Sequence, residues 1–406
     1  MLGGKALVLL ILLAIILVFV LWMIIDIKLG KRHHQSKVQP YREAPVRHTD
    51  ALFFGHGDEF FNHLFQQIEL AEDHIHIGFY IFRDDKVGQD LLLRLKKKAR
   101  EGVEVRLMVD WIGLSISSKE RNRLKHAGIS FAKTQSPSLP YFFYSLNERN
   151  HRKITVIDGK AGYIGGYNVG DEYLGKDPEK GPWRDYHLFL TGEAVADLQE
   201  QFLKDWERAY GEDVHKTVQY FPSLPEGKLK TQIVPTDGAH VQEFLMKLLS
   251  RAQKSVMIGT PYFIPGVEMR DYLVKLAEKG INIQILIPKY PDHPLVKDAA
   301  FPYFEPLLKA GVEIRQFYEG FYHSKALIID DNIADIGTAN FDMRSFNLNS
   351  EVNCIVYDEE WVRDVKGKIE KDFFGSSEKI TMEDVKNRTF KEKGKEALAT
   401  AMSPFM

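Results

Sequence analysis

Two histidine–lysine pairs are the residues in this sequence whose types and spacing could do chemistry. His151 precedes Lys153 by two positions, and His323 precedes Lys325 in the same way. Each pair is followed at matching distances by an aspartate, a glycine and an asparagine: Asp158, Gly165 and Asn168 in the first copy, and Asp330, Gly337 and Asn340 in the second. Corresponding members lie 172 residues apart. One His-x-Lys pair is common by chance, but two copies in register predict a functional site.

The spacing predicts that the two side chains of each pair point the same way. On a strand, residues i and i+2 share a face, so Ile154 and Val156 would face a core on the other side. If pseudo-twofold symmetry joins the copies, two imidazoles and two ammonium groups meet. Such a set suits a phosphodiester: the lysines neutralise phosphate oxygens, one histidine attacks phosphorus, and the other protonates the leaving oxygen. Because the cations are built in, we expect no cofactor and no metal. The alternative, two ordinary half-buried strands, explains one copy better than two.

The two aspartates are counted with the catalytic motif, but their spacing predicts a supporting role. Asp158 follows His151 by seven residues, which is roughly 23 Å along a strand and too far for contact. The dipeptide Asp158-Gly159 is typical of a tight hairpin turn. We expect Asp158 and Asp330 to hold the turn and the returning strand in register. Asn168 and Asn340, on the returning strands, are better placed to bind phosphate oxygens of the substrate.

Each catalytic histidine also needs a partner that fixes its tautomer. Asp185 follows His151 by 34 residues, and Glu351 follows His323 by 28 residues. These separations are similar, so we expect each carboxylate to orient the histidine of its own copy. The alternative is that both are surface charges or members of local salt bridges.

The elements around the motifs recur in the same order, which indicates a duplication. Strands at 74–82 and 103–110 alternate with helices before the first motif, and strands at 255–263 and 281–288 do so before the second. This alternation predicts an α/β fold in which each copy has a mixed sheet flanked by helices. We expect two domains, residues 51–222 and 228–377, and a C-terminal tail at 378–406.

The N-terminus predicts a single transmembrane helix. Residues 6–25 are an uncharged apolar run of 20 residues, about 30 Å long as a helix, which matches a bilayer's hydrocarbon core. A cleaved secretory signal is the alternative, but no small-x-small cleavage site follows the run. Only Lys5 precedes the run, whereas Lys28, Lys31 and Arg32 follow it. We therefore expect an anchor at 1–27, a juxtamembrane linker at 28–50 and a catalytic body on the cytoplasmic side of the cell membrane.

Composition narrows the function classes. The formal net charge of -2 lacks the basic excess that is typical of nucleic-acid-binding proteins. Cys354 is the single cysteine, so an intrachain disulfide and a four-cysteine zinc site are excluded. His74 and His76 share a strand face, but no third ligand accompanies them, so packing or surface exposure is the better interpretation.

These motifs resemble the phospholipase D superfamily, whose signature is the duplicated motif. Within it, the chain resembles bacterial cardiolipin synthases from about residue 40 onward. The resemblance is carried by NHRKITVIDGKAGYIGGYN, WRDYHLFLTGEAVADLQEQFLKDW, TPYFIPG, YHSKALIIDDNIADIGTANFDMRSFNLNSEVN and the final SPFM. Many members of this family carry two N-terminal spans where this chain has one, which indicates a shorter subtype.

The resemblance implies a phosphatidyltransferase with a ping-pong reaction. One histidine takes a phosphatidyl group from phosphatidylglycerol and releases glycerol, and a second phosphatidylglycerol accepts the group to give cardiolipin. By resemblance His151 is the nucleophile and His323 the acid–base, although the pseudo-symmetry leaves this assignment open. The expected partners are phosphatidylglycerol, other membrane phospholipids and the membrane itself, with no nucleic acid. A phospholipase D-type hydrolase shares every catalytic residue and stays the alternative, whereas a nuclease fits the anchor and the charge poorly.

Two features near the motifs keep two interpretations each. The aromatic stretch at 140–150 could form an apolar wall or meet the membrane interface, or it could be ordinary core. Arg344 could contact a lipid phosphate or pair with Asp342.

Overall fold

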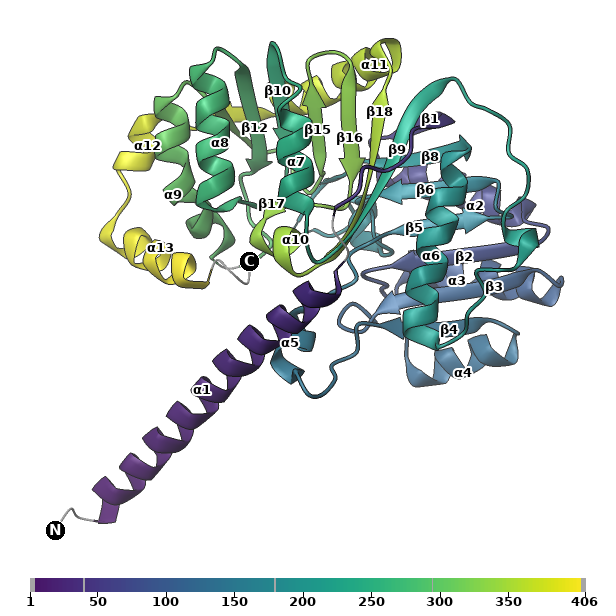
Figure 1. The fold of residues 1–406 in the computed structure, drawn as a ribbon, viewed down its shortest axis with the longest axis horizontal. Helices are drawn as coiled ribbons and strands as arrows, with labels where there is room; N and C mark the ends of the chain where they lie inside the picture. The colour runs from purple at the N-terminus through teal and green to yellow at the C-terminus, as the bar shows by residue number, and fades with distance from the viewer. Residues whose placement is uncertain (1–3, 39–40, 179, 294, 403–406) are drawn as a thin grey trace.

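The fold is built on one sheet of 15 strands that joins two similar halves (Figure 1). The computed structural model describes residues 4–38, 41–178, 180–293 and 295–402. From the seam outward, the first half has the strands β1 (Arg47–Phe54), β8 (His187–Gly192), β6 (Ala161–Gly165), β5 (Ile154–Ile157), β2 (His74–Phe79), β3 (Glu104–Asp110) and β4 (Ser130–Thr134).

The second half repeats this order from the other side of the seam. Its strands are β9 (Leu229–Asp237), β18 (Ser350–Tyr357), β16 (Ile333–Gly337), β15 (Ala326–Ile329), β10 (Ser255–Gly259), β12 (Asn282–Pro288), β13 (Glu313–Phe317) and, at the far edge, β19 (Ser377–Lys379). The halves meet where β1 pairs with β9 in antiparallel fashion. In each half three strands run parallel and the others antiparallel. The predicted duplicated α/β fold is confirmed, but the two mixed sheets are continuous rather than separate.

Helices cover both faces of this sheet (Figure 1). In the first half these are α2 (Gly57–Leu70), α3 (Lys86–Arg100), α4 (Ser118–His126), α5 (Phe142–Asn147) and α6 (Ala194–Tyr210). In the second half they are α7 (Val241–Leu249), α8 (Gly266–Glu278), α9 (Val296–Lys309), α10 (Met343–Asn347), α11 (Glu359–Glu370), α12 (Met382–Lys386) and α13 (Phe390–Met402). Short 3₁₀ segments lie at Asp171–Leu174 and Val218–Tyr220, and a π-helical turn lies at Lys371–Gly375.

The hydrophobic core has a part in each half and a part that spans the seam. The spanning part contains Phe202 and Trp206 of α6, Val362 of α11 and Cys354 of β18, all buried. Ile154 and Val156 belong to it too, so the apolar residues after the first histidine–lysine pair anchor the chain as predicted. The pair itself lies directly before β5 rather than on it. The shared core holds the two halves in a fixed relation.

The N-terminal apolar helix α1 (Gly4–Lys37) projects away from the body (Figure 1). Within the described chain it is the one helix that is long and apolar enough to cross a membrane. It continues through Lys37, so the first part of the expected linker is helical. Similarly, β1 begins before the expected domain boundary at residue 51.

The aromatic stretch before the first motif packs against α1. Trp22 and Phe143 have ring centroids 4.8 Å apart, and Asp26 accepts a hydrogen bond of 2.9 Å from the backbone N–H of Tyr144. At the other end of the chain, β19 pairs with β13, and Arg388 bridges to Asp298 of α9 at 2.6 Å. The residues expected to form a tail are therefore part of the second half.

The two motif aspartates hold turns. Asp158 (φ 53°) and Gly159 (φ 63°) both have positive φ, as a type I′ hairpin requires. The Asp158 carboxylate accepts backbone hydrogen bonds of 2.8–3.2 Å from Glu72, Asp73 and His74. The carboxylate of Asp330 (φ 52°) accepts the matching bonds from Gln253, Lys254 and Ser255. Each aspartate thus ties a hairpin to the start of the adjacent strand, and neither belongs to the cavity that holds the histidines.

Replacing Asp158 or Asp330 by alanine should therefore destabilise the fold without removing the chemistry. Alanine leaves three N–H groups without their acceptor and is strained at positive φ, so we expect a loss of roughly 2–4 kcal/mol in the free energy of unfolding. Asparagine, which tolerates positive φ, should cost less. Thermal unfolding measures the effect, and Asp364→Ala, which removes an exposed i,i+4 ion pair, is the control. Normal stability with lost turnover would show instead that these aspartates take part in the reaction.

Candidate active site

Both motif histidines line one cavity at the seam between the halves. Its volume is about 570 Å³. The wall includes His151, Asn168, His323, Asn340 and Arg344, so both copies of the motif contribute to it. The structure thus brings together the histidines and the asparagines of the two registered repeats.

Each histidine pairs with a carboxylate of the opposite half. His151 Nδ1 lies 2.9 Å from Oε2 of Glu351, and His323 Nδ1 lies 2.6 Å from Oδ2 of Asp185. All four side chains are buried. The expectation that each carboxylate orients the histidine of its own copy is therefore wrong, because the pairs cross the seam.

Backbone hydrogen bonds produce this crossing. The N–H of His151 donates to the carbonyl of Ser350 at 2.9 Å, and the N–H of His323 donates to the carbonyl of Arg184 at 2.8 Å. Ser350 and Arg184 are the residues directly before Glu351 and Asp185. On the Asp185 side, the short strands β7 (Trp183–Arg184) and β14 (Phe321–Tyr322) pair in parallel across the seam. The main chain therefore places each carboxylate beside the histidine it orients.

The hydrogen bonds set the protonation of the rings. An ionised carboxylate can only accept, so Nδ1 of His151, which faces Glu351, carries the proton and Nε2 is left with its lone pair. Nδ1 of His323 faces both the Asp185 carboxylate and the Lys325 ammonium group. Burial lowers the pKa of His151 to about 4, and burial together with the charge of Lys325 lowers the pKa of His323 well below its usual value. These lowered pKa values leave both imidazoles neutral at pH 7, and a neutral imidazole is a nucleophile.

The two lysines are buried beside the histidines. Lys153 Nζ donates to the carbonyl oxygen of His151 at 2.8 Å, and Lys325 Nζ lies 2.8 Å from Nδ1 of His323 and 3.8 Å from Oδ2 of Asp185. Burial lowers the pKa of Lys153 to about 7, helped by repulsion from Lys325, and lowers the pKa of Lys325 to about 8. Both ammonium groups therefore lack enough counter-charge, which an anion in the cavity would supply.

The two asparagines line the cavity and are already engaged with the protein. Asn168 Oδ1 accepts a hydrogen bond of 3.0 Å from the backbone N–H of Ile81. Asn340 Nδ2 donates to Asp342 at 2.9 Å, and its buried Oδ1 has no hydrogen-bond partner among the residues that the structure describes. They shape the wall, and a role in binding phosphate stays a prediction.

Aromatic rings and an arginine complete the site, and sequence reasoning missed them. The ring of Tyr80 lies 4.9 Å from that of His151, and the ring of Trp183 lies 4.9 Å from that of His323. Arg152 is buried; its Nε donates to the carbonyl of Glu351 at 2.9 Å, and its guanidinium pairs with Asp205. The signal that could have found it is its place between His151 and Lys153, where the second copy has a serine.

Two further predictions can be compared with the structure. His76 bonds to Gln199 and lies 3.2 Å from the guanidinium of Arg106, and both His74 and His76 are buried, so they pack in the core. Arg344 lines the cavity and donates to the carbonyl of Asn147 at 2.8 Å. It therefore lies where it could contact a substrate phosphate.

The chain is similar in sequence to known proteins of one family. The family model "Cardiolipin synthase, PLD-like domain" matches residues 64–206 and 245–373, one segment in each half. The minor cardiolipin synthase ClsB of Bacillus subtilis is 38% identical over 403 residues, which are 98% of this chain and 100% of the relative. The cardiolipin synthase of Halalkalibacterium halodurans is 40% identical over 365 residues, 88% of this chain and 72% of the relative.

A solved structure shares the fold at lower sequence identity. The phosphatidylserine synthase of Haemophilus influenzae matches with a TM-score of 0.69, covering 93% of this chain and 100% of that chain at 16% identity. The two-segment family match and the full-length relatives settle the family. The chain belongs to the cardiolipin synthase family of phospholipase D-like enzymes.

Proposed function

We propose that this enzyme is a cardiolipin synthase that transfers a phosphatidyl group from one phosphatidylglycerol to another and releases glycerol. The observation that carries the proposal is the single cavity in which two histidines, one from each half, are each held by a carboxylate from the other half. Relatives named cardiolipin synthase over nearly the whole chain support the choice of substrate.

In the first step one histidine attacks the donor phosphorus. Nε2 of His151, assigned as nucleophile by family resemblance, forms the N–P bond as the P–O bond to glycerol breaks. The ring then carries a positive charge, which the Glu351 carboxylate at Nδ1 stabilises. His323 gives its proton to the departing glycerol oxygen. The phosphodiester anion favours the protonated form of this second histidine, which the empty cavity disfavours.

In the second step the same groups act in reverse. His323, now neutral, takes the proton from the terminal hydroxyl of a second phosphatidylglycerol, and that oxygen attacks phosphorus. The N–P bond breaks, His151 is restored, and cardiolipin leaves. One phosphodiester is exchanged for another, so the balance needs no nucleotide and no oxidant.

The lysines stabilise the charge that gathers on phosphate during both steps. Their pKa values of about 7 and 8 in the empty cavity mean that an incoming phosphate restores their charge and gains two close cations. The anchor helix keeps the cavity near its lipid substrates, and we propose that the body lies on the cytoplasmic side, as the positive residues after the apolar run predict. The aromatic rings beside both histidines favour lipid over water as the acceptor.

The purified full-length enzyme in neutral detergent, given labelled phosphatidylglycerol, should form cardiolipin and glycerol in equal amounts. His151→Ala removes the side chain that carries the phosphatidyl group, and His323→Ala removes the side chain that carries the proton. Each variant should therefore lower this rate by at least about 10³-fold. His126→Ala, an exposed histidine on α4, is the matched control. If phosphatidic acid were the only lipid product, the enzyme would be a hydrolase rather than a synthase.

Removing one carboxylate charge should slow transfer with little effect on substrate affinity. Glu351→Gln and Asp185→Asn keep shape but weaken the hold on the tautomer and on the positive ring, so we expect kcat to fall on the order of 10²–10⁴-fold with KM changed far less. Steady-state kinetics measures both constants. Equal kcat in the wild type and either variant would show that the crossed pairs are not part of the reaction.

A further inference from the structure

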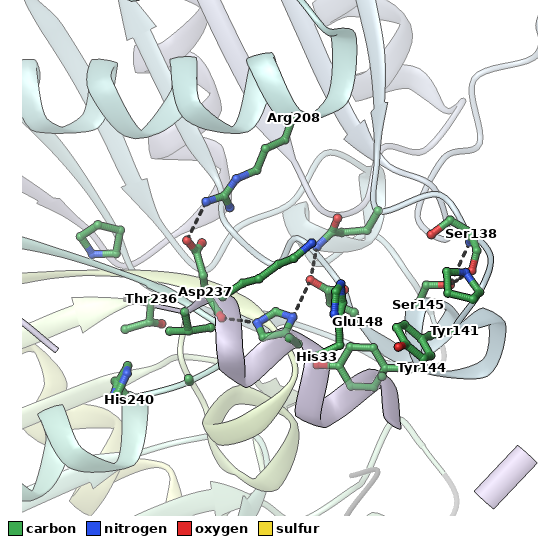
Figure 2. A pocket seen from close by; sticks show the side chains of 18 of the residues that line it. His33, Ser138, Tyr141, Tyr144, Ser145, Glu148, Arg208, Thr236, Asp237 and His240 are labelled. Carbon is green, nitrogen blue, oxygen red and sulfur yellow. Dashed lines mark hydrogen bonds and ion pairs between the residues drawn. The ribbon is translucent and has the colours of Figure 1, made fainter. Parts of the chain in front are cut away.

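A second cavity lies where the anchor helix meets the seam, and the proposed reaction does not use it (Figure 2). Its volume is about 580 Å³. The wall is formed by the end of α1 with Val38, Tyr41 and Arg42, by α5 and the loop that leads into it, by the end of α6, by the end of β9 and by the two residues before α7. None of the residues that line it also lines the histidine cavity.

The cavity wall carries basic side chains that no acidic side chain neutralises within the described part of the chain. Its two acids have partners: Asp237 pairs with Arg152 and with Arg208, the latter at 2.9 Å, and Glu148 lies 3.3 Å from His34. Figure 2 shows Arg208 pointing toward Asp237. In contrast, Lys37 and Arg42 line the cavity, are exposed, and have no hydrogen bond or ion pair within the described part of the chain.

A helix begins at the same wall. Ala239 and His240 line the cavity, and α7 starts at the next residue without a side-chain cap at its first turn. His240 itself is held by Glu243 at 2.9 Å. The first N–H groups of a helix have no partner inside it, and they carry the positive end of the helix dipole. An uncapped start of this kind binds anions, and phosphate in particular.

A buried hydroxyl adds an unused donor. Thr236 lines the cavity with 7% of its surface exposed, and its Oγ1 has no hydrogen-bond partner among the described residues. Its backbone carbonyl is already used by Arg152 at 2.8 Å. A buried hydroxyl without a protein partner can donate to a ligand that enters the cavity.

We propose that this cavity binds a phosphate group, held by Lys37, Arg42, the Thr236 hydroxyl and the start of α7. Two sources share this chemistry: the headgroup of an anionic phospholipid and free phosphate. The lipid source fits the depth of the site, because Gly30 and His33 lie roughly 8–12 Å along the helix beyond the apolar run, near the headgroup region. The proposal concerns binding alone and does not rest on the proposed reaction.

The site lies close to the catalytic machinery through one arginine. Arg152 contacts Thr236 and Asp237 on one side and donates to the carbonyl of Glu351 on the other. Glu351 in turn orients His151. A bound phosphate would therefore steady the strand end that supports the first histidine.

The test measures the unfolding temperature of the full-length protein in neutral detergent. Inorganic phosphate, at ionic strength matched with chloride, is one probe, and micelles containing phosphatidylglycerol, compared with the same fraction of zwitterionic phosphatidylcholine, are the other. Each probe should raise the Tm of the wild type. The double variant Lys37→Ala/Arg42→Ala should lose at least half of that rise, because a charge-assisted contact is worth about tenfold in affinity. Thr236→Val should lose a smaller part.

The matched control is Lys125→Ala/Arg100→Ala, which removes one exposed lysine and one exposed arginine elsewhere. The histidine cavity is intact in both double variants, so its own binding cancels in the comparison. If the Tm rise is selectively lost with phosphatidylglycerol alone, the result supports the lipid headgroup as the ligand. If it is lost with phosphate alone, the result supports the free anion. If it is lost with both, the site binds either ligand. Equal responses of the two double variants would overturn the proposal. Because no turnover is measured, this result is independent of whether the enzyme makes cardiolipin.

Discussion

The antiparallel pairing of β1 with β9 is the contact on which the rest of the molecule depends. It covers only the pairs Arg47–Thr231, His48–Lys230 and Thr49–Leu229, and the buried hydroxyls of Thr231 and Thr49 bond across it at 3.0 Å. Because the spanning core packs against both half-sheets, this short seam fixes the halves closely enough for a histidine of one to reach a carboxylate of the other. Either half alone would hold an imidazole without its orienting acid and an acid without its imidazole.

The electrostatics of the cavity follow from this arrangement. Two lysines, two histidines and two carboxylates are buried together, and the lysines are short of counter-charge when the cavity is empty, which is why burial lowers their pKa values to about 7 and 8. In the proposed reaction, a phosphodiester would supply this counter-charge on binding, and the state with the most negative charge on phosphate would be stabilised most. The electrostatics of the site therefore favour a phosphate group in transfer over a neutral ligand.

The sequence identified the side chains of the site but not which half supplies the carboxylate partner of each histidine. The registered repeats identified His151, Lys153 and their counterparts, because a symmetric site requires the same residue types twice. The turn at Asp158 could be predicted from the Asp-Gly dipeptide and from the length of the strand before it. The crossing of Glu351 to His151 depends on strand order across the seam, which no local pattern encodes, so pairing by chain separation gave the wrong partners. Arg152 escaped notice because its counterpart is a serine, which breaks the repeat. The helical course of residues 28–37 was missed because the polar, basic composition there resembles a linker, whereas packing of α1 against α5 extends the helix.

The central claim is that both halves form one site in which a single histidine carries the phosphatidyl group. Rapid acid-free quenching of the enzyme with labelled phosphatidylglycerol, followed by intact-protein and peptide mass spectrometry, counts the groups bound per chain and locates them. We predict a maximum of one phosphatidyl group per chain, bound to one motif histidine, and its loss when that histidine is replaced. Two groups per chain, one on each histidine, would contradict it, because the halves would then act as independent sites.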